Sequence, residues 1–376
     1  MLSRFIENQI LENLKPGVVL ALLGARRTGK TVLLNKIKGL LSDKKTLMVQ
    51  GENLDVSEIL SSQRLNTLKK FVDGYDYLFI DEAQEIPNIG INLKLLVDNV
   101  PNLSVFITGS SSFDLKNKVG EPLVGRNLFL HLYTLSQLEL KETEDLLQTK
   151  EGLETKLIYG LYPQVFTAAS EAKKRQQLES IRDGYLLKDI LTADNLKDSH
   201  FVFNLLRLVA FQIGNDVSFT EMASNLNVHM KTVKRYLELL EKTFVLFSLN
   251  GFSRNLRKEY TKTPRYFFWD SGIRNVLISN FNPLHLRDDV GKLWENYCIA
   301  ERIKKIRYQN VPANSFFWRT YDQKEIDLVE EREGKLFGYE MKWKEDRVRP
   351  PKDFLLAYSG SSYEVINQNN YLEFIG

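Results

Sequence analysis

A glycine-rich segment near the amino terminus, GARRTGKT, has the composition of a loop that binds phosphate. Four residues separate Gly24 from the run Gly29, Lys30 and Thr31, and the loop lies between the apolar run VVLALL and the helical pattern TVLLNKI. In this context, backbone N–H groups and a helix amino terminus surround the phosphates, the lysine reaches the β- and γ-phosphates, and the threonine hydroxyl ligates Mg²⁺. A chance glycine-rich turn is disfavoured because both flanking elements match. The residues expected to bind ATP are Gly24, Ala25, Arg26, Arg27, Thr28, Gly29, Lys30 and Thr31.

A pair of acidic residues follows the apolar run YLFI. Asp81 is placed to hold the magnesium ion through water, and Glu82 to orient and polarise the water that attacks ATP. Alone, such a pair usually marks a strand that leaves the core, but together with a phosphate-binding loop it indicates ATP hydrolysis. The later run SVFITGS ends at Ser110, whose hydroxyl is expected to sense the γ-phosphate; a strand-end cap is the alternative.

A third group of reactive side chains lies in the carboxy-terminal part of the chain. The alternation in LFGYEMKWK places Glu340 and Lys342 on one face of a strand, and a hairpin with the preceding strand KEIDLVEE would bring Asp327 near Glu340. Glu295, in KLWENY, could approach the same place from a helix. Such carboxylates can hold Mg²⁺, and the lysine can position or deprotonate a water molecule. The alternative is an ordinary half-exposed hairpin with a charged outer face.

The nucleotide residues need a scaffold that brings strand ends together. Short apolar runs alternate with amphipathic helical segments from Val18 to about Leu132, which predicts a parallel, doubly wound α/β sheet with ligands at the carboxyl ends of its strands. The expected strands are Val18–Leu23, Thr46–Gln50, Tyr77–Ile80, Ser104–Thr108 and Leu128–Leu132. The expected helices are Thr31–Leu41, Val56–Val72 and Ile91–Val100.

The length of 376 residues predicts two or three domains. We divide the chain into an ATPase domain at 1–140, a helical segment at 141–215, a domain at 216–285 and an α/β domain at 286–376, and the resemblances described below imply that the last two are winged-helix-like and nuclease-like. The net charge of +3 is too small to indicate a nucleic-acid partner by itself. The single cysteine and the lack of an apolar run that could cross a bilayer predict a cytoplasmic protein without a membrane partner.

The segment SFTEMASNLNVHMKTVKRYLELLEK has the pattern of a helix–turn–helix. Ser218 or Thr220 is expected to cap the first helix, and Lys231, Lys234 and Arg235 are expected on the exposed face of the second. This pattern resembles a winged-helix domain, in which such a helix enters the major groove of DNA. A module that only packs between domains is the equal alternative. A basic run follows, which either contacts DNA or RNA or is a solvated loop: Arg254, Arg257, Lys258, Lys262 and Arg265.

Arg126 directly precedes the fifth expected strand. At this point the chain resembles the AAA-type ATPases, in which an arginine so placed reaches the phosphate of a neighbouring subunit. The resemblance implies that Arg126 takes part in catalysis and that the active form is a homo-oligomer. A surface arginine without a catalytic role is the alternative.

The Asp, then Glu-x-Lys arrangement after a helix with a glutamate resembles the PD-(D/E)xK nuclease fold. The order of the whole chain, with GLYPQV, YFFWDSGIRN and GKLWENY, resembles a prokaryotic family of AAA-type ATPases with a nuclease-fold carboxy-terminal domain. This resemblance implies an ATPase whose nucleotide state controls a nucleic-acid-directed, Mg²⁺-dependent domain, with Glu295, Asp327, Glu340 and Lys342 as its site. The alternative is a nucleotide-gated switch for DNA or protein whose carboxy-terminal domain is catalytically silent.

Overall fold

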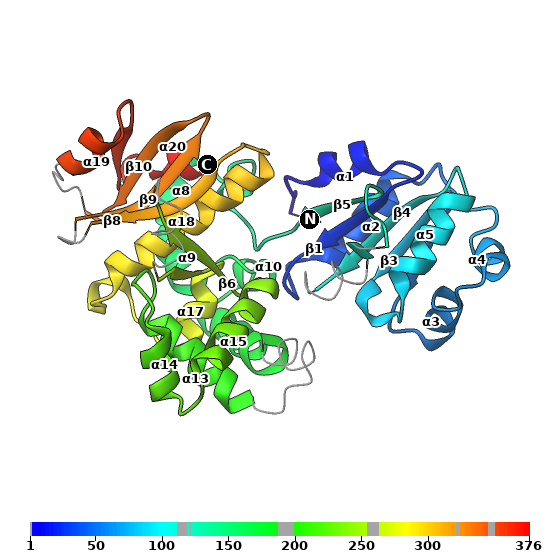
Figure 1. Cartoon of the computed structure of the whole chain (residues 1–376), viewed down its shortest axis with the longest axis horizontal. Helices are drawn as coiled ribbons and strands as arrows, with labels where there is room; N and C mark the ends of the chain where they lie inside the picture. The colour runs from blue at the N-terminus through cyan, green and yellow to red at the C-terminus, as the bar shows by residue number, and fades with distance from the viewer. Residues whose placement is uncertain are drawn as a thin grey trace. The chain divides into compact units, whose positions relative to one another are not determined.

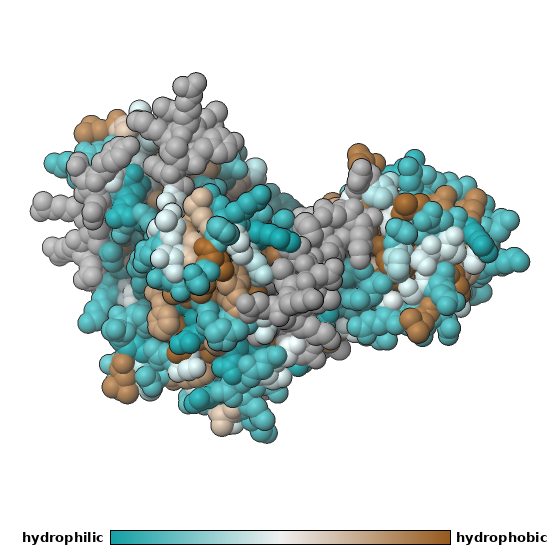
Figure 2. Space-filling model, turned by 60° about the horizontal axis from the view of Figure 1, so that its bottom comes forward, coloured by the Kyte–Doolittle hydropathy of each residue, from teal (hydrophilic) through white to brown (hydrophobic). Residues whose placement is uncertain are grey.

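The computed structural model describes residues 2–110, 119–120, 122–186, 199–253, 263–320, 324–344 and 350–376. The chain forms two compact units (Figure 1), which are treated separately below. The first unit is mainly Met1–Tyr133, and the second begins at Thr134 and includes most of the remaining chain to Gly376. Within the described residues, no helix is long and apolar enough to cross a membrane. Figure 2 shows a mainly hydrophilic surface on the face in view, with hydrophobic residues in small separate groups.

The first unit is built on a five-stranded sheet in the order β2-β3-β4-β1-β5, and every neighbouring pair is parallel. All residues of β1 and β4 are buried, which explains why these strands are continuous apolar runs. The predicted parallel α/β sheet is confirmed. Its strands are β1 (Val19–Leu23), β2 (Thr46–Gln50), β3 (Tyr77–Asp81), β4 (Ser104–Gly109) and β5 (Asn127–His131).

Helices pack around this sheet, with α2 against β3 and α5 against β4. One long helix was predicted at 56–72, and that prediction is wrong because two helices occupy the segment. Between them Gln63 has a left-handed backbone (φ +53°), and its N–H donates to the side chain of Asn92 (2.8 Å), so it cannot continue a helix. The helices of this unit are α1 (Glu7–Asn13), α2 (Lys30–Leu40), α3 (Leu54–Leu60), α4 (Leu65–Phe71), η1 (Ala83–Glu85) and α5 (Ile89–Asn99).

The second unit begins with helices, as the sequence predicts. In the predicted helix–turn–helix, the Ser218 hydroxyl caps α14 by accepting from the N–H of Glu221 (3.3 Å). Its helices up to this motif are α7 (Gln137–Leu140), α8 (Leu146–Glu151), α9 (Leu153–Tyr159), α10 (Pro163–Phe166), α11 (Glu171–Ile181), the π-helical turn η2 (Arg182–Leu186), α13 (Ser199–Phe211), α14 (Phe219–Asn225) and α15 (Met230–Lys242). The later helices are α17 (Ser271–Leu277), η3 (Leu284–Leu286), α18 (Val290–Tyr308), α19 (Lys352–Ala357) and α20 (Tyr371–Ile375).

A six-stranded sheet forms the other half of this unit, in the order β11-β10-β9-β8-β6-β7. β9 is antiparallel to both β8 and β10, whereas β11 is parallel to β10 and β6 is parallel to β8. The long helix α18 packs against β7 and β10. The sheet therefore includes strands from both sides of the predicted limit at 285/286. Its strands are β6 (Leu246–Gly251), β7 (Arg265–Phe268), β8 (Asn314–Arg319), β9 (Glu325–Arg332), β10 (Lys335–Met341) and β11 (Ser362–Ile366).

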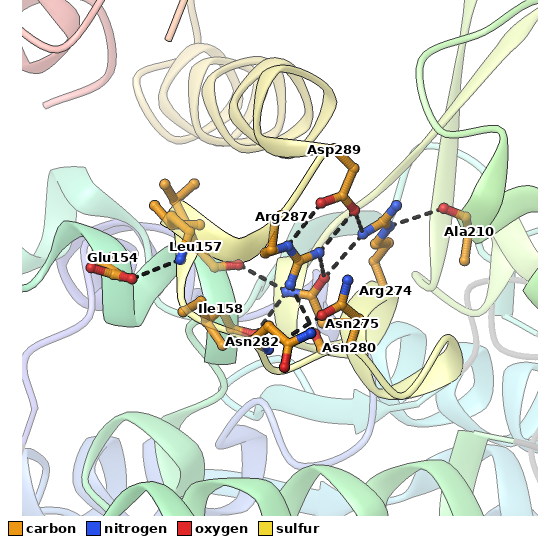
Figure 3. A network of polar contacts seen from close by, with 11 residues as sticks. Glu154, Leu157, Ile158, Ala210, Arg274, Asn275, Asn280, Asn282, Arg287 and Asp289 are labelled. Atoms are coloured by element: carbon orange, nitrogen blue, oxygen red, sulfur yellow. Dashed lines mark hydrogen bonds and ion pairs between the residues drawn. The ribbon is translucent and has the colours of Figure 1, made fainter.

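A buried polar network fixes α17 within the helical part of the second unit (Figure 3). Arg274 Nε donates to the carbonyl of Ala210 on α13 (2.9 Å), and Asn275 Nδ2 donates to the carbonyl of Ile158 on α9 (2.8 Å). Arg287 reaches both Asn275 Oδ1 (2.9 Å) and the carboxylate of Asp289 (2.8 Å). Although burial raises the pKa of Asp289, the Arg287 and Arg274 guanidiniums lower it to about 2. The motif YFFWDSGIRN thus has an architectural role here.

Candidate functional site

The predicted phosphate-binding loop lies at the carboxyl end of β1 and leads directly into α2. A Cβ on Gly24 would lie 2.2 Å from the carbonyl oxygen of Leu132, so only glycine fits there. Gly29 adopts φ +99° and precedes the first residue of α2, Lys30. The glycines that the motif requires therefore occupy positions where the backbone itself excludes a side chain.

Hydroxyl groups from the loop and from β4 converge on Asp81 at the end of β3, beside the lysine of the loop. The buried ammonium of Lys30 donates to the carbonyls of Gly24 (3.0 Å) and Ala25 (3.2 Å), inside the loop. Thr31 Oγ1 donates to Asp81 Oδ2 (2.7 Å), and Thr108 Oγ1 donates to Asp81 Oδ1 (2.5 Å). A hydroxyl and a carboxylate oxygen in contact form a hard oxygen donor set, which fits a magnesium ion shared with nucleotide phosphates.

Glu82 sits beside this group in an unusual backbone conformation. Its backbone is left-handed (φ +52°, ψ +49°), and its N–H donates to Thr108 Oγ1 (3.0 Å). A Cβ on Gly51 would lie 2.4 Å from the Glu82 carbonyl oxygen, so β2 can approach this kink only with a glycine. The Glu82 carboxylate lies 3.9 Å from Lys30 Nζ. The structure therefore brings together Lys30, Thr31, Asp81 and Glu82, as the sequence predicted.

The two further residues predicted for this site differ in their surroundings. Ser110 is buried just after β4, and its hydroxyl accepts from Gln84 Nε2 (3.3 Å). Arg126, immediately before β5, forms an ion pair with Asp98 near the end of α5, and its side chain is 46% exposed. This partial exposure leaves a face of the guanidinium open to solvent. The catalytic role of Arg126 towards a neighbouring subunit stays a prediction.

Arg4 contacts the nucleotide loop, although no sequence pattern pointed to it. Its buried guanidinium donates to the carbonyl of Thr28 in the loop (2.7 Å) and to the carbonyl of Tyr133 (2.7 Å), which directly precedes the second unit in the chain. Glu7 supports this arrangement, since its carboxylate accepts from Arg4 N (2.8 Å) and Lys36 Nζ (2.7 Å). The Arg4 side chain thus connects the phosphate-binding loop to Tyr133, the last residue of the first unit before the second begins.

In the second unit, the carboxylates predicted at the carboxy-terminal site are buried, although a half-exposed hairpin was the alternative. Glu295 lies on α18, Asp327 on β9 and Glu340 on β10, and each residue is at most 7% exposed. Asp327 Oδ2 accepts from the N–H of Met341 (2.8 Å), and Lys342 Nζ lies 2.8 Å from Glu340 Oε1.

Mutual repulsion and burial make these carboxylates hard to ionise. Burial, followed by the charge of Asp327, raises the pKa of Glu295 to about 8 and that of Glu340 to about 7. Burial also raises the pKa of Asp327, against the lowering effects of the Met341 N–H and Lys342. We refer to Glu295, Asp327 and Glu340 as the carboxylate cluster.

Two oxygens of the carboxylate cluster, Glu295 Oε1 and Glu340 Oε2, are buried without a hydrogen-bond partner in the described structure. Buried unpaired carboxylate oxygens fit a hard cation as ligands. However, among the described residues no three His, Cys, Asp or Glu side chains are arranged to hold a metal ion. The donor chemistry therefore fits Mg²⁺ but the present arrangement is not a formed three-ligand site, and the metal role of the cluster stays a prediction.

Binding of nucleic acid by the basic residues of α15 stays a prediction. Lys231, Lys234 and Arg235 are exposed on α15, as expected, and Lys234 Nζ also lies 5.0 Å from the centre of the Phe219 ring.

Arg265 does not belong to the predicted nucleic-acid surface, and its predicted place in it is wrong. It is 1% exposed and pairs with Asp216 (2.8 Å) and Glu325 (2.7 Å), so its charge is neutralised inside the unit. The other members of the basic run lie outside the described residues: Arg254, Arg257, Lys258 and Lys262.

Family models match three consecutive parts of the chain. Residues 17–141 match a model described as "AAA domain", residues 150–284 match "Domain of unknown function (DUF8612)", and residues 290–371 match "Domain of unknown function (DUF4143)". The first match contains the phosphate-binding loop, the acidic end of β3 and the whole five-stranded sheet.

Similar chains occur in bacteria. The chain is 27% identical over 336 residues to an uncharacterised protein of Mycobacterium tuberculosis, covering 86% of this chain and 70% of the relative. It is 24% identical over 373 residues to an uncharacterised protein of Haemophilus influenzae, covering 93% and 88%. A solved structure, the Walker-type ATPase of Pyrococcus abyssi, is similar over 74% of this chain and 96% of that chain, with 16% identity and a TM-score of 0.47. By its matched family model, loop geometry and parallel sheet, the first unit is similar to AAA-type P-loop ATPase domains.

Proposed function

We propose that this chain binds and hydrolyses ATP with Mg²⁺, and that its nucleotide state controls a nucleic-acid-directed, nuclease-like region in the second unit. The observation that carries the ATPase part is the contact between Thr31 Oγ1 and Asp81 Oδ2 at 2.7 Å, beside the buried ammonium of Lys30. A hydroxyl, a carboxylate and a lysine at the end of a phosphate-binding loop form the minimal set for a nucleoside triphosphate with its metal.

Each residue has a distinct task in this proposal. Lys30 exchanges its bonds to the loop carbonyls for bonds to the β- and γ-phosphates, and Thr31 and Asp81 hold Mg²⁺, which neutralises phosphate charge when bound. Glu82 orients and polarises the attacking water, and its left-handed backbone sets the direction in which its side chain leaves the main chain. Arg126 adds positive charge at the γ-phosphate of a neighbouring subunit, so hydrolysis requires a homo-oligomer.

The ATPase proposal is tested by nucleotide binding and turnover of matched variants. Lys30→Ala should abolish ATP binding, while Lys38→Ala, an exposed lysine on the same helix, should bind as wild type. Glu82→Gln should bind ATP but hydrolyse it at least about 100-fold more slowly. Normal turnover by Glu82→Gln would remove its assigned role, and wild-type protein without affinity for any nucleoside triphosphate would refute the ATPase proposal.

For the second unit we propose magnesium-dependent cleavage of DNA or RNA. The unpaired oxygens of Glu295 and Glu340 support a cation site, and Lys342, 2.8 Å from Glu340, is placed to orient a water molecule. Incubation with DNA and RNA, with Mg²⁺ or Mn²⁺ and with or without ATP, tests this. Cleavage should be lost in Asp327→Ala and Lys342→Ala but kept in Lys344→Ala, which replaces an exposed lysine. Equal cleavage by all variants would indicate a contaminant.

The alternative is a nucleotide-gated binding switch with a silent carboxylate cluster. It is favoured by the absence of a preformed three-ligand site among the described residues and by the exposed Lys231, Lys234 and Arg235 on α15. In that case the protein should bind DNA without cutting it, and its affinity should fall steeply with added salt. Loss of binding in Lys231→Ala/Lys234→Ala would support the switch, and a flat salt response would contradict it.

A further inference from the structure

The side chain of Gln84 connects two residues of the proposed hydrolytic site. It is buried in η1, and its Nε2 donates to Glu82 Oε2 (2.5 Å) and to Ser110 Oγ (3.3 Å). The orientation of the amide follows from chemistry, because an ionised carboxylate only accepts hydrogen bonds and therefore must face the NH₂ group. Nε2 also lies 3.5 Å from Glu85 Oε1, the longest of these three contacts, so the closer partners of the amide are the Glu82 carboxylate and the Ser110 hydroxyl.

The backbone around Glu82 makes this contact possible. Residue 82 is left-handed, and the 3₁₀ turn Ala83–Glu85 begins immediately after it, so the side chain two residues later returns to the carboxylate. Thr108 fixes the kink through the Glu82 N–H, and Gly51 leaves room for the Glu82 carbonyl. Such a left-handed non-glycine residue costs about 1–3 kcal/mol, and it persists only where surrounding contacts enforce it.

We propose that Gln84 is a positioning residue that keeps the Glu82 carboxylate directed at the attacking water; this inference rests on the proposed ATPase function. Lys30 Nζ lies 3.9 Å from the other carboxylate oxygen of Glu82. The attraction between these opposite charges pulls the carboxylate towards the lysine, which is needed at the phosphates. The hydrogen bond from the Gln84 amide opposes this attraction, so that the Glu82 carboxylate stays at the water and the Lys30 ammonium stays at the phosphates.

The same amide links Glu82 to the presence of a γ-phosphate. Because Ser110 Oγ accepts from Gln84 and donates to none of the described residues, its own hydrogen can be donated to a phosphate oxygen. When the Ser110 hydroxyl donates to a γ-phosphate oxygen, Ser110 Oγ is held in place, and this is the oxygen that accepts from Gln84. Gln84 in turn fixes the Glu82 carboxylate, so the base is ordered when the substrate is complete.

The test compares Gln84→Ala, Ser110→Ala and the double variant with wild type. ATP affinity is measured by nucleotide titration and hydrolysis by single-turnover rates. Gln84→Ala should bind ATP within about twofold of wild type and hydrolyse it about 10- to 100-fold more slowly, because a misplaced base loses that much rate. The control is Glu58→Gln, an exposed residue on α3 outside these contacts, which should keep the wild-type rate. The losses of the two single variants should not multiply in the double variant, since both break one chain of contacts.

A second variant separates positioning from a purely structural role. Gln84→Glu keeps the length of the side chain but replaces its donors with a carboxylate that repels the one on Glu82, so its single-turnover rate should fall at least as far as that of Gln84→Ala while its ATP affinity stays within about twofold of wild type. Unchanged hydrolysis in Gln84→Ala, multiplicative losses, or a Gln84→Glu variant as fast as wild type would each overturn the inference while leaving the ATPase proposal intact. Wild-type protein that binds but does not hydrolyse ATP would overturn both.

Discussion

Replacement of Glu295 by glutamine should stabilise the second unit at pH 8 and leave it nearly unchanged at pH 5. Glutamine keeps the shape of the side chain but cannot carry the buried charge. Burial and the nearby Asp327 raise the pKa of Glu295 from 4.5 to about 8. Between these values the folded chain binds more protons than the unfolded chain, so the free energy of unfolding of wild type falls as pH rises.

The magnitude follows from the shift. The difference of 8 − 4.5 = 3.5 pKa units corresponds to about 5 kcal/mol at alkaline pH. At pH 5 the corresponding loss of unfolding free energy is less than about 1 kcal/mol, because pH 5 lies only half a pH unit above the unfolded pKa of 4.5. The stability that wild type has below pH 4.5 is therefore lost progressively up to pH 8, and the variant should not show this loss.

Urea unfolding followed by tryptophan fluorescence measures the effect, because all four tryptophans lie in the second unit: Trp269, Trp294, Trp318 and Trp343. Wild type and Glu295→Gln are compared at pH 5, 6.5 and 8 in the presence of a chelator. Glu373→Gln, an exposed acid on α20, is the control and should follow wild type at each pH. A stability difference between wild type and Glu295→Gln that stays constant across this range would refute the reasoning.

Three further changes test single contacts. Arg265→Met should destabilise the second unit by about 1–3 kcal/mol in urea unfolding, because Glu325 loses its buried partner while Asp216 keeps Arg319 and both carboxylates are partly exposed; an unchanged free energy of unfolding would contradict this. Ser218→Ala should cost about 1 kcal/mol because α14 loses its cap, and Ser218→Asp should restore it. Arg4→Ala should raise the rate of amide hydrogen exchange in the phosphate-binding loop. Arg4→Lys should restore only part of the protection, because one ammonium cannot bond equally to the carbonyls of Thr28 and Tyr133. Unchanged exchange in Arg4→Ala would show that these two hydrogen bonds are dispensable.

The sequence predicts the first unit well because its signals are local. Five apolar runs of strand length correspond to five buried or half-buried strands, and the spacing of Gly24, Gly29 and Lys30 places the loop between β1 and α2. Asp81 and Glu82 follow from the end of an apolar run. In each case the pattern and the structure depend on residues that are neighbours in the chain.

The missed features depend on residues that are far apart in the chain. Arg4 meets Tyr133 across 129 positions, and no local pattern predicts such a contact. Gln84 was overlooked because the left-handed backbone of Glu82, which returns the chain towards the carboxylate, is set by Thr108. Arg265 was assigned to a basic surface because the acids that neutralise it come from distant segments. Positive charge in a run of residues therefore does not predict positive charge on a surface.

The strand pairing in the sheet of the second unit limits how the carboxy-terminal part of the chain can be moved to another protein. β6 borders β7 on one side and β8 on the other, so strands before and after residue 285 complete each other's hydrogen bonding. A fragment beginning at residue 286 would carry β8 as an unprotected sheet edge, which invites aggregation. The carboxylate cluster consequently cannot be transplanted onto another ATPase by itself: recombination in evolution or in the laboratory has to move it together with the preceding helices and β6.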